Sequence, residues 1–446
     1  MRQWRIVALV GLCGLALVLV ILNRWFRPMD VHTERQAARA AGIPLTSADF
    51  PLPHYSPAQD SSPKWKALAP MLGKLDRDPT WRAIEAAEVD GTPPKSSNPD
   101  LFRLISEERE TLNGIHAAAA KAGRSPSRDF GPAVLYPDLP RLRDAAKLLR
   151  LESLATARRG NPEEAIRNQA LGFRLAKQAA EEPNIIGFLV GNAVERLTLS
   201  GMGDILRESP TPAVSAAVRA ALVQGAPRYD FVRALKGEAL TGLATIRMGD
   251  PPAFVRAVYQ DPSEAVYLHF VTKQIRAAAL PPNRRAEAMR AAGRGMDFTP
   301  LKGPSYLLTS TLHPVYSRAG DREVQVMARR AVLLAGADAL AYRSQHGAFP
   351  TRLDIASPNA VDPFTEKALG YRRTAKGFVV YSSGPDGAFN GLPGRAAAGQ
   401  AYFSYPDSSL TPATRRTAVP PLRPMPAGNI PKPARMPSGP SVPVRP

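Results

Sequence analysis

The chain has 446 residues, of which 44% are hydrophobic, so it is long enough for two or three domains and can bury a substantial core. It carries 58 Lys and Arg against 39 Asp and Glu, which gives a formal net charge of +19 at pH 7. This excess is spread thinly along the chain rather than clustered as in a nucleic-acid binder, so we expect no nucleic-acid partner. The single cysteine, Cys13, excludes an intrachain disulfide.

An uncharged run near the N-terminus is the first element along the chain. Residues 6–22 read IVALVGLCGLALVLVIL and, as a helix rising about 1.5 Å per residue, would span roughly 25 Å, enough to cross a bilayer. No A-x-A-like cleavage site follows, and Trp25 and Phe26 stand where interfacial aromatics belong. We predict an uncleaved transmembrane anchor at residues 1–28. A cleaved signal peptide and a buried soluble helix are the alternatives.

The charges that flank this run bear on its orientation in the membrane. Two arginines precede the run and four follow it by residue 39, which under the positive-inside rule would place the large C-terminal part in the cytoplasm. A short basic tail directly before an apolar run is, however, the usual start of a signal-anchor, and long domains translocate largely regardless of charge. We expect a single-pass protein of the inner (plasma) membrane with an extracytoplasmic body.

Proline and helical periodicity divide the next part of the chain. Residues 29–63 are punctuated by proline and lack a helical period, which predicts a spacer between the membrane and the body. Residues 64–300 contain helical patterns separated by Pro and Gly, which predict a domain of helical hairpins packed side by side. One predicted helix face, with steps of three and four residues, consists of Leu142, Ala145, Leu148, Leu151 and Ala155.

The sequence IIGFLVGNAVERLTL, residues 185–199, is apolar on nearly all sides over its first ten residues. This run is too short to cross a membrane before Glu195, so it predicts a central buried helix. Its glycines Gly187 and Gly191 would let neighbouring helices approach closely, because glycine has no side chain to separate them.

Residues 301–407 predict a small α+β module. A helical pattern covers residues 321–346, and Gly347 then supplies a left-handed cap. Two short strands at 369–374 and 378–383, with a glycine in the turn between them, predict a β-hairpin.

The last segment, residues 408–446, holds six Lys or Arg and no acidic residue among many prolines, and cannot bury enough apolar surface to fold. We therefore predict a disordered tail. The expected fold class is mainly α: a transmembrane helix, a helical-hairpin body, a small C-terminal α+β module and a disordered Pro-rich tail.

Three motifs in the C-terminal part carry a resemblance to a known family. ALAYRSQHGAFPTRL, DPFTEKALGYRR and GFVVYSSGPDGAFNG follow one another as a helix end, an Asp-Pro-aromatic turn, a hairpin and a glycine- and aspartate-rich loop. In this order they resemble the C-terminal part of the major pseudopilin of type II secretion, over residues 340–391. The whole chain is also similar to Ala-rich bacterial proteins that have a membrane anchor and a helical middle.

The resemblance implies one candidate metal site. In pseudopilins the glycine-aspartate loop holds a calcium ion, and the matching positions here are Asp386 and Asn390. Calcium takes six to eight oxygen ligands, usually several of them from carboxylates, and this loop offers one carboxylate. The alternative is a Pro-Asp-Gly turn that serves geometry alone. Calcium is the only cofactor that the sequence suggests.

Motifs for common chemistries are missing from the sequence. It contains no H-E-x-x-H metal spacing, no G-x-S-x-G elbow and no G-x-x-x-x-G-K-[ST] phosphate loop. The carboxylate pairs Glu163–Glu164 and Glu181–Glu182 stand at expected helix ends, where solvated faces explain them. We expect a non-enzymatic, membrane-tethered scaffold or interaction protein of the bacterial cell envelope with protein partners, and the resemblance implies a link to secretion machinery. The alternative is a membrane-bound enzyme that uses a cleft between the helices.

Overall fold

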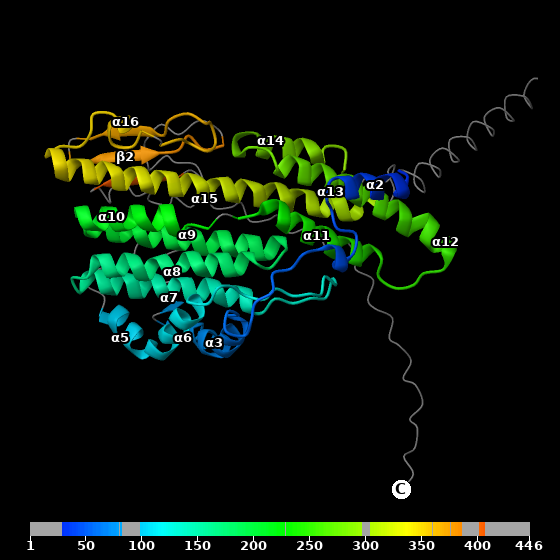
Figure 1. Ribbon diagram of the computed structural model, residues 1–446, viewed down its shortest axis with the longest axis horizontal. Helices are drawn as coiled ribbons and strands as arrows, with labels where there is room; N and C mark the ends of the chain where they lie inside the picture. The colour runs from blue at the N-terminus through cyan, green and yellow to red at the C-terminus, as the bar shows by residue number, and fades with distance from the viewer. Residues whose placement is uncertain are drawn as a thin grey trace, which may run out of the picture.

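The computed structural model describes residues 29–79, 81–82, 99–227, 229–296, 304–358, 360–374, 376–385 and 401–405. This part of the chain is mainly helical with one small sheet near its C-terminal end, which confirms the expected fold class at that level (Figure 1). The predicted anchor and the predicted tail lie outside the described residues. Among the helices of the described ranges, none is both long enough and apolar enough to span a bilayer.

The helices follow one another along the whole chain, and most are separated by Pro, Gly or Asn. Their bounds are α2 Val31–Ala40, α3 Ser62–Leu75, α5 Pro99–Glu107, α6 Arg109–Ala119, α7 Asp138–Arg158, α8 Pro162–Ala180, α9 Ile185–Glu208, α10 Pro212–Ala220, α11 Phe231–Ile246, α12 Ala253–Val255, α13 Asp261–Ala278, α14 Pro282–Gly293, α15 Leu307–His346 and α16 Leu353–Ala356. Short 3-10 turns cover Ser47–Asp49 and Pro304–Tyr306, and π-helical turns cover Ala221–Gly225 and Arg256–Gln260.

The helices α7, α8, α9 and α15 form successive layers, with α3, α5 and α6 outside α7 (Figure 1). The predicted face of α7 is buried in the core, as expected from its periodicity. Helix α9 is the predicted central helix: it contacts α7, α8, α10, α11 and α15. Asn184 caps its start by accepting a hydrogen bond from the Gly187 N–H at 2.7 Å.

Two glycines of α9 set the distance to α8. A Cβ at Gly187 would lie 2.8 Å from the carbonyl oxygen of Ala179, and one at Gly191 would lie 2.9 Å from that of Ala176. Any larger residue would push the two helix backbones apart, so the predicted close approach is confirmed.

The sheet contains the predicted hairpin and one strand that the sequence did not predict. Strands β1 (Gly370–Arg373) and β2 (Phe378–Tyr381) pair antiparallel, and β3 (Tyr402–Tyr405) pairs antiparallel with the other edge of β2. The sheet packs on α15 and shares one core cluster with α8, α9 and α10. Members of this shared cluster include Phe173, Met202, Val332, Phe378 and Phe403.

Two sequence expectations need correction. Residues 29–63 are not simply an extended spacer, because α2 packs on α13, and Ile43 and Leu45 enter the core beside α13. The final long helix begins at Leu307 rather than Asp321 and continues through Pro314. Proline in a helix interior costs about 3 kcal/mol, and the burial of Tyr316 and its neighbours against α13 offsets that cost.

Candidate anion-binding site between α9 and α15

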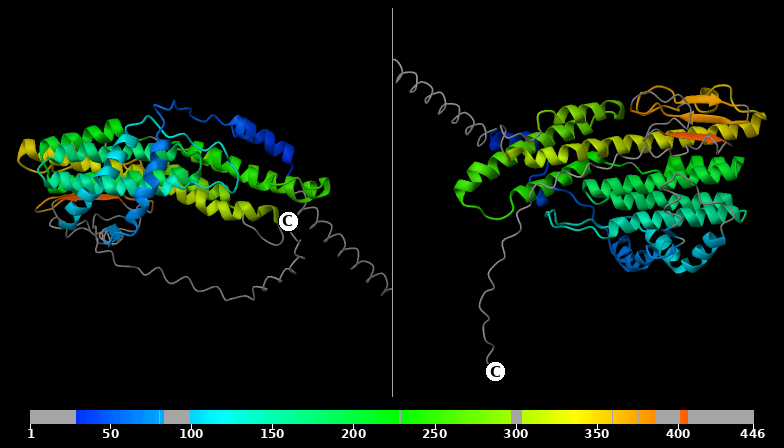
Figure 2. Two further views of the ribbon diagram at one scale, coloured as in Figure 1. Left: turned by 90° about the horizontal axis from the view of Figure 1, so that it is seen from below. Right: turned by 180° about the vertical axis from the view of Figure 1, so that it is seen from behind.

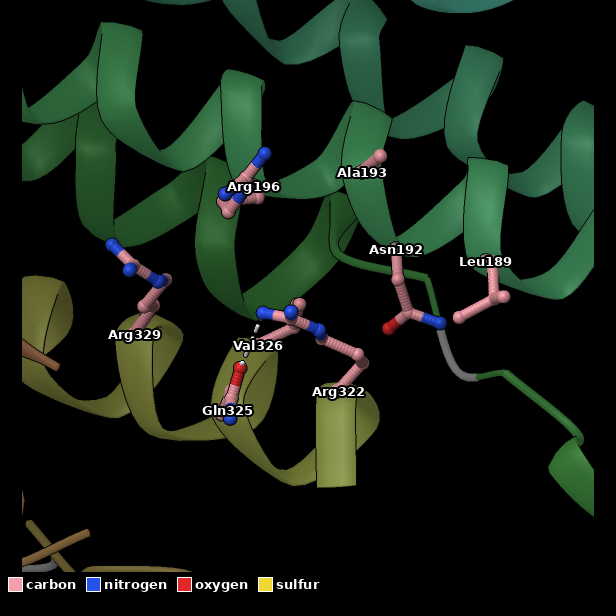
Figure 3. Close-up of a pocket in the computed structure, with 8 residues that line it drawn as sticks. All are labelled: Leu189, Asn192, Ala193, Arg196, Arg322, Gln325, Val326 and Arg329. Atoms are coloured by element: carbon pink, nitrogen blue, oxygen red, sulfur yellow. Dashed lines mark hydrogen bonds between the residues drawn. The ribbon is translucent and has the colours of Figure 1, made fainter. Parts of the chain in front are cut away.

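A cavity of about 410 Å³ lies between the central helix α9 and the long helix α15 (Figure 3). Each helix lines it with one face, at positions i, i+3, i+4 and i+7, which are neighbours on a helix surface. The lining residues are Leu189, Asn192, Ala193 and Arg196 from α9, and Arg322, Gln325, Val326 and Arg329 from α15. We call this site the arginine groove.

The charge of the arginine groove is entirely positive. Three of its eight lining residues are arginines, and none of the eight is Asp or Glu. Burial and, next, the positive charges of Arg196 and Arg322 lower the pKa of half-buried Arg329 to about 10. Arg329 therefore stays protonated at pH 7 while like charges repel it.

The polar contacts within the groove leave donors and one acceptor available to a ligand. Arg322 Nη1 donates to Gln325 Oε1 at 3.2 Å (Figure 3). Arg329 has no hydrogen bond or ion pair with any residue that the structure describes. Asn192 is buried; its Nδ2 donates to the Phe188 carbonyl at 2.9 Å, while its Oδ1 has no partner in the described part of the chain. That bond to a carbonyl fixes the orientation of the amide, so Oδ1 can only accept.

A smaller cavity of about 70 Å³ adjoins the groove and shares Arg329 with it. Its far side is covered by Tyr402 and Phe403 of β3. Here Arg207 is already occupied: its Nη1 donates to Asp204 at 2.9 Å, its Nε donates to the Ser404 carbonyl at 3.3 Å, and its guanidinium lies 5.0 Å from the ring centre of Phe403. The smaller cavity is thus lined by β3 and by an α9 arginine that a carboxylate already neutralises.

On the neighbouring face of the same two helices, in contrast, arginine is paired with a carboxylate. Glu195, fully buried on α9, accepts from Nε of Arg330 on α15 at 3.1 Å. Arg330 Nη2 also donates to the Pro227 carbonyl at 2.9 Å. Burial raises the pKa of Glu195, and the charge of Arg330 opposes that rise. Arg329 and Arg330 are neighbours on α15, but Arg330 is neutralised by a carboxylate and Arg329 is not.

The candidate calcium ligands Asp386 and Asn390 lie outside the described residues. The chain just before them is held by Asp362, a fully buried carboxylate that the sequence indicated only as part of a turn. It accepts from Ser383 N at 2.7 Å and from Ser382 Oγ at 2.9 Å. In the described ranges, no three or more His, Cys, Asp or Glu side chains gather as a metal ion would require.

The expectation that Glu181 and Glu182 are solvated is wrong. Both are buried, because distant segments supply their partners: Tyr55 Oη donates to Glu181 at 2.6 Å, and Arg124 Nη2 donates to Glu182 at 2.6 Å. Burial raises the pKa of each carboxyl, against these hydrogen bonds. This cluster joins the segment around Tyr55, the loop at Arg124 and the end of α8, which is a structural role.

Comparisons with known proteins add no relative: no protein-family model, no curated protein and no solved structure matches this chain. The candidate function therefore rests on the arginine groove and on the residues themselves.

Proposed function

We propose that this protein is a non-enzymatic, membrane-tethered binding protein of the bacterial cell envelope, anchored by residues 6–22, and that its arginine groove holds an oxyanion. The observation that carries the oxyanion is the meeting of three arginines across one cavity without a lining carboxylate. Burial and the neighbouring positive charges lower the pKa of Arg329, and a bound oxyanion would oppose both effects. The C-terminal resemblance to a pseudopilin supports a place near secretion machinery.

The lining residues define the class of ligand. Planar guanidinium groups donate paired N–H bonds to carboxylate, sulfate or phosphate oxygens, so Arg322 and Arg329 suit any of these. The unpaired acceptor of Asn192 suits a hydroxyl or N–H group on the same ligand. Leu189 and Val326 supply apolar contacts. The proposed ligand is a small molecule, or the end of a larger one, with an oxyanion beside a hydrogen-bond donor.

The same lining argues against the enzyme alternative. The eight lining side chains include no Ser, Cys, His, Asp or Glu, so the groove itself holds neither a nucleophile nor a general base. Arginine stays protonated in proteins and cannot take a proton from a substrate at neutral pH. A groove of this composition binds and orients an anion without transforming it.

The test is anion-specific stabilisation of the full chain in detergent. Sodium phosphate, sulfate and chloride are compared at constant ionic strength, and the thermal midpoint is measured. A phosphate concentration a hundredfold above the dissociation constant should stabilise the protein by about 2.7 kcal/mol. Arg329→Gln should lose most of this gain.

The matched control is Arg352→Gln, which removes the same charge from a side chain that is 75% exposed and paired with exposed Asp354. It should keep the full response to phosphate. An equal loss in both variants would show a general effect of net charge, and an identical response of the unmodified protein to all three salts would overturn the proposal.

A further inference from the structure

A short projecting segment exposes several apolar side chains at one end of the molecule. Between α11 and α13 the chain turns through α12, which forms the tip in Figures 1 and 2. Met248 is 70% exposed, Phe254 73% and Tyr259 48%, and Val255 is also exposed. We call these four residues the apolar tip. Single exposed apolar residues are ordinary, but four within twelve residues form a local patch.

The apolar tip is part of an ordered loop. Gln260 is buried at its base and donates to the Ile246 carbonyl at 3.0 Å, which closes the loop. Arg256 and Asp250, the charged residues of the loop, pair with each other at 2.9 Å. The loop is therefore close to neutral, and its exposed apolar side chains lie beside one exposed ion pair.

The apolar tip and α2 are tied to one buried carboxylate. Arg247, immediately before Met248, binds Glu264 through Nε at 2.9 Å, and Arg35 of α2 binds the same carboxylate at 2.7 Å. A second contact, from His269 Nδ1 to Glu34 at 3.1 Å, also holds α2 on α13. The views agree that α2 and α12 lie at the same end of the molecule (Figures 1 and 2).

This arrangement limits the distance from the tip to the membrane. The proposed anchor ends at Leu22, and Met29 already packs on the core beside α13. Seven residues span at most about 25 Å when fully extended. The lipid surface at which the anchor emerges must therefore lie near the end of the molecule that carries the tip.

We propose that the apolar tip inserts into the interfacial layer of the bilayer that holds the anchor, so that the membrane contacts the body at a second point. This inference rests on the membrane tether of the proposed function. Phenylalanine, tyrosine and methionine suit the boundary between headgroups and acyl chains. Because the loop is close to neutral, insertion does not depend on anionic lipid or on low salt.

The experiment places a fluorophore on the full chain in nanodiscs of phosphatidylcholine. Cys13→Ala removes the native thiol, and Phe254→Cys supplies a labelling site at the tip. The control is Ile355→Cys, an exposed position on α16 at the opposite end of the molecule (Figure 1). With brominated lipid, we expect loss of fluorescence at position 254, unchanged in high salt, and none at position 355.

Carbonate washing of membranes that contain the unmodified chain distinguishes failure of the membrane tether from failure of the second membrane contact. A chain released by carbonate would overturn the tether and the second contact together. A chain that is retained but shows no lipid quenching at position 254 would overturn the second contact alone. A label at 254 that is shielded from aqueous iodide yet not quenched by lipid would mean that protein covers the tip, which also overturns the proposal.

Discussion

The arginines on two faces of α15 have opposite electrostatic environments. On one face, Arg330 meets the buried carboxylate of Glu195, and elsewhere along the helix Glu323 pairs with Arg285 and Asp338 with Arg219. On the other face, Arg322 and Arg329 look across a cavity at Arg196 (Figure 3). The fold thus supplies carboxylates where arginine contributes to packing and none among the residues that line the groove.

This difference shows why the net charge of the chain does not indicate where its positive charges cluster. Counted along the sequence, the positive excess is spread thinly and indicates no patch. The groove collects arginines from α9 and α15, which are more than a hundred residues apart in the sequence, and none of its eight lining residues is a carboxylate. A local cluster of this kind suits one oxyanion, whereas a nucleic-acid backbone requires an extended basic surface.

The largest expected effect is a loss of stability when Arg330 is replaced, on the face of α15 where arginine is paired with a carboxylate. Arg330→Met removes the charged partner of Glu195, whose side chain is 0% exposed, and leaves a buried carboxylate without an opposite charge beside it. Breaking a buried ion pair in this way costs roughly 3–5 kcal/mol in the free energy of unfolding. Urea denaturation would measure it.

A companion variant separates the lost pair from lost packing. Glu195→Gln together with Arg330→Met removes both charges and should recover a large part of the stability, with a coupling energy on the order of 1–3 kcal/mol. Additive effects of the two substitutions would show that the ion pair is not what distinguishes this face of α15.

The buried carboxylate of Glu264, which is also paired with arginine, makes stability depend on pH. Burial alone would raise the pKa of Glu264, but hydrogen bonds from Arg247 and Arg35 and their charges outweigh burial and lower the pKa to about 2. Because the folded-state pKa lies below the unfolded value near 4.5, the ionised carboxylate stabilises the fold fully above about pH 4.5 and loses this effect as the pH falls toward 2.

Glu264→Gln should therefore cost about 3 kcal/mol at pH 7 relative to the unmodified protein, and this difference should shrink between pH 4.5 and 2. Unfolding by urea at several pH values measures the difference directly. Asp354→Asn, at an exposed ion pair, should show little change at any pH. A difference for Glu264→Gln that stays constant with pH would contradict the assigned ion pairs.

The sequence was sufficient for the features that depend on local periodicity. The buried face of α7, the central position of α9, the glycine cap after His346 and the β1–β2 hairpin all follow from spacing within one segment. Tertiary packing decided the rest. Helix α15 begins before Pro314 because residues of its first turns are buried on α13, and β3 forms because β2 has a free edge.

The site was harder to predict than the fold. Arg196 and Arg329 each occupy an ordinary position on a helical pattern, and nothing local indicates that the two helices are neighbours. Glu181 illustrates the same limit, since its partner Tyr55 lies 126 residues away. The residues Leu189, Asn192, Ala193 and Arg196 share one face of α9 in the sequence, but the cluster of three arginines forms only when α15 brings two more opposite that face.

The smallest expected effect on stability belongs to the arginine groove itself. Arg329→Met removes a charge that repels Arg196 and Arg322 and has no carboxylate partner in the described part of the chain. We expect the free energy of unfolding to rise by less than about 1 kcal/mol in the absence of added oxyanion, because the repulsion is relieved. Raising the concentration of sodium chloride should stabilise the unmodified protein by screening this repulsion, and the variant should respond less. A loss as large as that of Arg330→Met would show that Arg329 has a structural partner, and the contrast between the two faces of α15 would then disappear.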